Sequence, residues 1–139
     1  MKRKLIHALL ICLLVPLLGA AQSNPSRSVS VRSAAAPVYP PVALTANTSG
    51  DVQVAVTIEK TGNVTNADFV SGNPLLHKAA VEAAKRWKFE KLNEEAKVQL
   101  IFSFRMVPKD TSAEDMTPVF MPPYHLEVRG KLPAPTVNY

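Results

Sequence analysis

The chain has 139 residues, a length that suits one domain. Its 16 basic and 11 acidic residues give a formal net charge of +5, but Lys2, Arg3 and Lys4 precede an apolar N-terminal run, and without them 13 basic residues face 11 acidic ones. A balance of +2 argues against a nucleic-acid-binding domain. The one cysteine, Cys12, lies in the same run. If this run is a signal that is removed on export, the mature chain has no disulfide, no thiolate metal site and no cysteine nucleophile.

The N-terminus has the three parts of a secretory signal. Basic residues are followed by an apolar stretch from about Leu5 to Leu18 and by small residues at 19–21. We therefore predict a cleaved signal peptide over residues 1–22. The alternative is an uncleaved membrane anchor, but the 14 uncharged residues from Ala8 to Ala21 would span only ~21 Å of a hydrocarbon core of ~30 Å.

The distribution of proline divides the rest of the chain. Only Pro74 lies between Val42 and Val107, whereas both flanks are rich in proline. This contrast predicts a compact domain over residues 39–107 between two extended arms. We expect a disordered Ser/Ala/Pro linker at residues 23–38 and a Pro-rich tail at 108–139.

Apolar and polar residues alternate along three segments of the domain. The first segment, Val52–Ile58, leads through a turn at Lys60–Asn63 into a second strand at about Val64–Ser71, where one break in the alternation suggests a bulge. The third segment runs from Val98 to Met106. In the tail, residues Tyr124–Arg129 alternate in the same way and form a candidate strand that could pair with a free sheet edge of the domain.

A helix is predicted between the second and third strands. Asn73 suits the N-cap and Pro74 the first helical position. The apolar stripe consists of Leu76, Ala79, Ala80, Ala83 and Trp87. With a candidate short helix at Pro41–Ala46, the order predicts a small α+β two-layer sandwich, in which one helix packs on a three-stranded antiparallel sheet.

The motifs of this domain occur in a specific order. They are Tyr39-Pro40, Gly50, the Val52-Val54-Val56 strand, Gly62-x-Val64, Ser71, Pro74-Leu75-Leu76, Ala79-Ala80, Ala83 and Trp87-x-Phe89. The ordered run, from about Val38 to Met106, resembles the C-terminal domain of the TonB family, the periplasmic energy transducers of Gram-negative bacteria. The chain departs from a complete transducer in two ways. Arg3 stands where the family has a serine, four residues before the membrane-helix histidine, which is here His7. The family's long Pro-rich spacer, which serves to cross the periplasm, is missing, and the 16-residue linker in its place reaches at most ~55 Å.

The resemblance implies a periplasmic, non-enzymatic module that receives the TonB box, a short extended segment of an outer-membrane transporter, as an added strand. The docking edge it implies is the third strand with the Tyr39-Pro40 corner nearby. The implied peptide-binding residues are Tyr39, Pro40, Val98, Gln99, Leu100, Ile101, Phe102, Ser103, Phe104 and Arg105. An alternative role for Tyr39-Pro40 is a stiff turn, and Trp87 and Phe89 are expected to be core aromatics.

Two other functions remain open at this point. The edge strand could pair with a second copy, which would make the protein a self-associating scaffold, or an uncleaved N-terminus would make it an anchored transducer. Catalysis is not expected, because His77 and His125 have no carboxylate at a ligand or triad spacing. The sequence also has no Gly-rich phosphate loop, and we expect no cofactor, metal, nucleic acid or small-molecule substrate.

Overall fold

The computed structural model describes residues 28–135, so the predicted signal peptide and residues 136–139 lie outside the described residues. The elements are β1 (Val31–Ser33), α1 (Pro41–Thr45), β2 (Gly50–Ile58), β3 (Val64–Ser71), α2 (Pro74–Lys85), β4 (Lys88–Phe89), β5 (Ala96–Val107), the 3₁₀ turn η1 (Glu114–Met116), β6 (Val119–Met121) and β7 (His125–Lys131). The α+β class, the four predicted elements of the domain and the short N-terminal helix are confirmed.

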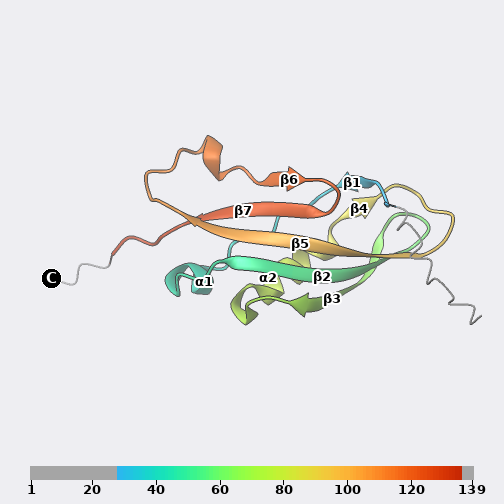
Figure 1. Ribbon diagram of the computed structural model, residues 1–139, viewed down its shortest axis with the longest axis horizontal. Helices are drawn as coiled ribbons and strands as arrows, with labels where there is room; N and C mark the ends of the chain where they lie inside the picture. The colour runs from blue at the N-terminus through green and yellow to red at the C-terminus, as the bar shows by residue number, and fades with distance from the viewer. Residues whose placement is uncertain (1–27, 136–139) are drawn as a thin grey trace, which may run out of the picture.

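The sheet is larger than predicted. It has five strands in the order β3-β2-β5-β7-β6, with β7 and β6 on one side of β5 and β2 and β3 on the other (Figure 1). The predicted three-stranded antiparallel sheet corresponds to β3, β2 and β5, while β7 pairs with β5 in parallel and β6 pairs with β7 in the antiparallel sense. The Pro-rich tail therefore completes the sheet, because all of its prolines lie outside β6 and β7 and leave the backbone N–H groups of both strands free to pair.

The register of β2 against β5 is continuous. Gly50 lies opposite Phe104 and Ile58 lies opposite Ala96. The hairpin between β2 and β3 has two irregularities, beside Val54 and beside Ile58, where the sequence predicted one. Such bulges twist an edge strand and hinder pairing with another chain.

Helix α2 packs on one face of the sheet and closes the core. Asn73 caps it by accepting a hydrogen bond from the Leu75 N–H at 2.9 Å. Its small residues Ala80, Ala83 and Ala84 are fully buried and let the helix lie close to the strands. The core also contains Val52, Val54, Val56, Ile58, Leu76, Trp87, Phe89, Leu100, Phe102, Phe104, Leu126 and Val128. Trp87 and Phe89 are thus core aromatics, as predicted.

The segment before the domain is packed, which corrects the prediction of a disordered linker for residues 28–38. Strand β1 pairs with β4, Val29 is buried, and the Trp87 indole N–H donates to the Ala35 carbonyl at 3.0 Å. The Ser/Ala composition suggested disorder, but these small residues let the backbone approach the aromatic residues at the end of α2. Within residues 28–135, no helix combines the length and the apolar character that crossing a membrane requires.

Candidate functional site

The candidate site is the side of β5 that faces away from β2. β7 pairs with this side only from Ile101 onward, so five residues at the start of β5, Ala96 to Leu100, have no strand partner there among the described residues. The Ile101 N–H donates to the Tyr124 carbonyl at 2.9 Å, which shows that the backbone groups of Ile101 point toward β7. Because backbone direction alternates along a strand, those of Lys97 and Gln99 point the same way and are free to receive an added strand.

A groove runs beside this open stretch. Its volume is about 550 Å³, and its lining consists of Ser28, Val29, Ala96, Lys97, Val98, Gln99, Pro123 and Tyr124. A second hollow of about 350 Å³ also borders Ser28 and Val29, and the loop from Glu90 to Glu95 lines the rest of it. The lining of the groove thus combines apolar residues, among them Val29, Val98 and Tyr124, with the open edge of β5, a combination that suits an extended peptide.

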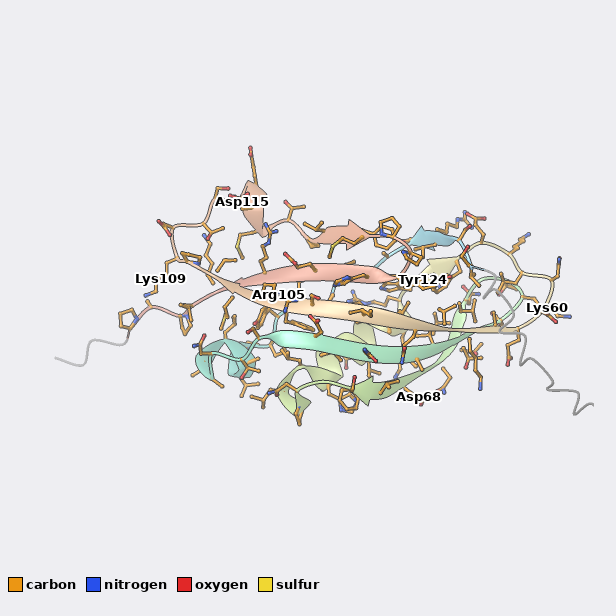
Figure 2. The ribbon with its side chains drawn as sticks, viewed as in Figure 1. Lys60, Asp68, Arg105, Lys109, Asp115 and Tyr124 are labelled. Atoms are coloured by element: carbon orange, nitrogen blue, oxygen red, sulfur yellow. The ribbon has the colours of Figure 1, made fainter. Side chains whose placement is uncertain are left out.

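Tyr124 forms the wall at which the open stretch ends. Its hydroxyl accepts a hydrogen bond from the Val29 N–H at 2.6 Å and donates one to the Val29 carbonyl at 3.0 Å. Its ring packs edge-on against Phe89 at a centroid distance of 6.3 Å. In Figure 2, Tyr124 is seen at the start of β7, close to β4. The residue thus joins the N-terminal segment, the core and the tail at one point.

Tyr39 and Pro40 lie away from the open stretch. The Tyr39 ring is buried edge-on against Phe104 at 5.3 Å, and its hydroxyl donates to the Thr48 carbonyl at 2.6 Å. Burial raises the pKa of this hydroxyl, although the positive charge of Arg105 opposes the rise. The Pro40 carbonyl accepts the first hydrogen bonds of α1. Both residues have the structural role that was the alternative to ligand contact.

The other predicted docking residues fall into three groups. Leu100, Phe102 and Phe104 are buried beneath the sheet, and only Val98 and Gln99 border the groove. Ile101, Ser103 and Arg105 direct their backbone toward an edge that β7 already occupies. The structure therefore shows a shorter free edge than the sequence predicted.

A hydrogen-bonded cluster of Asp51, Ser103 and His125, which the sequence did not reveal, crosses the face of the sheet opposite α2. Ser103 is fully buried, and its hydroxyl oxygen lies 2.6 Å from Oδ1 of Asp51 and 2.6 Å from Nε2 of His125. The Ser103 hydrogen bond lowers the pKa of Asp51, helped by Arg105, whose Nη2 lies 2.8 Å from the same oxygen. Arg105 projects from β5 onto this face (Figure 2).

The Asp51–Ser103–His125 cluster does not have the arrangement of a catalytic triad. In a triad the imidazole lies between the carboxylate and the serine, whereas here Ser103 lies between Asp51 and His125. The serine is also closed to solvent, so a substrate could not reach it. Among residues 28–135, no group of three His, Cys, Asp or Glu side chains could hold a metal ion. The cluster joins β2, β5 and β7 through side-chain hydrogen bonds.

Comparison with known proteins bears on the same region. Residues 35–106 match the family model described as the Gram-negative bacterial TonB protein C-terminal. Two curated relatives, both described as Protein TonB, come from strains B100 and ATCC 33913 of Xanthomonas campestris pv. campestris. Each is 39% identical over 66 residues, which cover 46% of this chain and 30% of the relative. The family match ends before the tail that supplies β6 and β7.

Proposed function

The chain belongs to the TonB C-terminal family, and from this premise we propose that it is a periplasmic, non-enzymatic binding module of TonB-dependent transport. Its partner is an extended segment of an outer-membrane transporter, bound as an added strand. The open stretch of β5 carries this proposal, because among residues 28–135 no strand pairs with the outward backbone groups of Lys97 and Gln99, which lie beside a groove of about 550 Å³. The binding residues are then Val98, Gln99 and their neighbours in the groove.

The interface is small, and modest affinity follows from its size. Strand addition at five residues supplies few backbone hydrogen bonds, each contributing about 1 kcal/mol net. Lys97 and Gln99 direct their side chains to the exposed face, so these side chains contribute little to peptide selection. Selection comes from the apolar lining, Val29, Val98 and Tyr124.

The test is an amide NMR titration of residues 23–139 with synthetic TonB-box peptides from transporters of the same organism. We expect shifts at Ala96–Leu100, Val29 and Tyr124. Gln99→Pro removes one outward N–H without removing a hydrogen bond to β2, so it should abolish binding, whereas Gln99→Ala keeps the backbone and should bind like the wild type.

A second test leaves the protein unchanged. Methylating the backbone nitrogens of the peptide removes its donors but keeps its side chains, and this should also abolish binding. No shifts at millimolar peptide in the folded wild-type domain would overturn the proposal. Equal binding of the methylated peptide would show that side chains, and not strand addition, hold the ligand.

We extend the proposal to the organisation of the whole chain. Residues 1–22 direct export and are removed, residues 39–107 form the domain whose strand β5 receives the partner, and residues 108–139 form the tail. N-terminal sequencing of the exported protein tests this, since a start near Ser23 supports a released periplasmic protein. A retained N-terminus would favour the anchored transducer instead.

Self-association is a second candidate function, favoured by the outer edge of β6. Val119 and Phe120 there are 39% and 40% exposed, and no described strand pairs with that edge. A second copy could extend the sheet by pairing β6 with β6. The solution mass decides, because a concentration-independent monomer across the micromolar range excludes this function.

A further inference from the structure

The tail already occupies most of the edge at which we place the partner. Its strand β7 runs parallel to β5 from Ile101 to Val107, and Leu126 and Val128 are buried in the core. This strand lies beyond residue 106, where the family match ends. The open stretch Ala96–Leu100 is in line with β7, so a peptide bound there and running parallel to β5 would meet the start of β7 at Tyr124.

The two ends of β7 are held in different ways. The end next to the open stretch is held by the Tyr124–Val29 hydrogen bonds and the Ser103–His125 contact, by the Tyr124 ring against Phe89, and by the pairing of His125–Glu127 with β6. At the far end, Gly130 packs so tightly against Tyr39 and Leu44 that an added Cβ would come within 2.5 Å of a Leu44 methyl carbon. The near end borders the open stretch, and its hydrogen bonds to β5 and to Val29 can be exchanged for those of a ligand, whereas the far end is held by the packing of Gly130.

We propose that the open stretch of β5 is the starting point for strand exchange, in which a bound peptide displaces β7 residue by residue toward Val107. The inference rests on the proposed function and defines the peptide that fits. Each backbone hydrogen bond of β7 is replaced by an equivalent one from the peptide, so the ladder changes little in free energy during the exchange.

The side chains of β7 define the chemistry of the partner. Leu126 and Val128 fill the core beside Phe102 and Phe104, and Gly130 leaves room for Tyr39. A displacing strand must therefore carry apolar residues at two alternate positions and a small residue two positions later. It must also have donors where Pro122 and Pro123 have none, because these prolines are what ends the pairing of β5 in this chain.

Two synthetic peptides test the exchange. The short peptide copies residues 124–131, and the long peptide adds Val-Thr-Val-Thr before them, placed opposite Ala96–Gln99. A control carries serine at the positions of Leu126 and Val128 in the long peptide. We expect the long peptide to bind about tenfold more tightly than the short one, because only it uses the open stretch, and we expect the control to lose the displacement.

Hydrogen exchange in the full domain is the deciding measurement. With the long peptide, the amides of Leu126 and Val128 in β7 should lose protection, while the Ser103 amide in β5 stays protected by its new partner. Tyr124→Phe removes the hydroxyl contacts but keeps the ring, and it should accelerate β7 exchange roughly tenfold even without peptide. Its chemical-shift pattern in β2 and α2 verifies the fold.

The outcomes separate the two proposals. If the long peptide shifts Ala96–Leu100 but β7 keeps its protection, strand exchange is wrong and the docking function stands. If neither peptide shifts β5 and TonB-box peptides also fail, the docking function is wrong. If the serine control displaces β7 as well as the long peptide does, the stated apolar pattern is wrong.

Discussion

The hydroxyl oxygen of Ser103 in β5 lies 2.6 Å from Nε2 of His125 in β7. The same oxygen lies 2.6 Å from Oδ1 of Asp51 in β2, and the one hydroxyl proton of Ser103 can be donated in only one of these two contacts. The lowered pKa of Asp51 keeps that carboxylate ionised at neutral pH, and an ionised carboxylate can only accept. Ser103 therefore donates to Asp51, and His125 must donate to Ser103.

This geometry predicts the tautomer of His125. At about pH 9, where free imidazole is neutral, the remaining proton should be on Nε2 and not on Nδ1. Imidazole ¹⁵N shifts of the wild type distinguish the two nitrogens, with exposed His77 as the internal comparison. Ser103→Ala should restore a mixture of tautomers. A proton on Nδ1 in the wild type would contradict the assigned hydrogen-bond direction.

The lowered pKa of Asp51 predicts how the free energy of unfolding depends on pH. Its pKa is below the ordinary value of 3.8 in the folded state, so its contribution is present above that value and is lost as the pH falls through the folded pKa. Since Asp51 and Arg105 are 53% and 43% exposed, the contribution should be below about 1 kcal/mol. Urea unfolding from about pH 5 to about pH 2 should show a flatter profile for Asp51→Asn than for the wild type. Asp110→Asn, in the exposed loop after β5, should leave the profile unchanged.

Tyr39→Phe separates stability from binding. The substitution removes the hydrogen bond to the Thr48 carbonyl but keeps the ring against Phe104, and it should reduce the free energy of unfolding by about 1 kcal/mol. The affinity for TonB-box peptides should not change, because Tyr39 is remote from the open stretch of β5. A tenfold loss of affinity in a folded variant would return Tyr39 to the docking site.

Gly130→Ala tests the packing that holds the far end of β7. The new methyl group would meet Leu44 at 2.5 Å and the Tyr39 ring at 2.6 Å, and the ring is held in place by its own contacts. Overpacking of this kind should cost about 1–3 kcal/mol. Thermal unfolding measures it, and Lys131→Ala, at an exposed neighbouring position, provides the matched control. Equal melting temperatures would mean that α1 and its loop yield easily.

Local pattern was sufficient for the elements of the domain. The alternation in Val52–Ile58 and Val98–Met106, the turn before Val64 and the cap at Asn73 each act over a few residues, so each could be recognised in one sequence. Composition misled at residues 28–38, because Ser and Ala suggest disorder unless a distant partner such as Trp87 is known to bind the backbone.

Long-range pairing was not recoverable in the same way. The alternation at Tyr124–Arg129 predicted a strand that could cover a free edge, and the structure confirms that it pairs within the domain. Its parallel direction and its start opposite Ile101 depend on where the chain turns after β5. The Asp51–Ser103–His125 cluster likewise joins residues 52 and 22 positions apart, with no recognisable spacing.

The sequence by itself determined the α+β class, the order of elements in residues 39–107 and the family resemblance, because periodicity, caps and turns are local properties of the chain. Only the tertiary structure decided how much of β5 is open to a partner. That length depends on where β7 enters the sheet, and it enters at Ile101 because the pairing of two distant strands is set by the packing of Leu126, Val128 and Gly130 against the core.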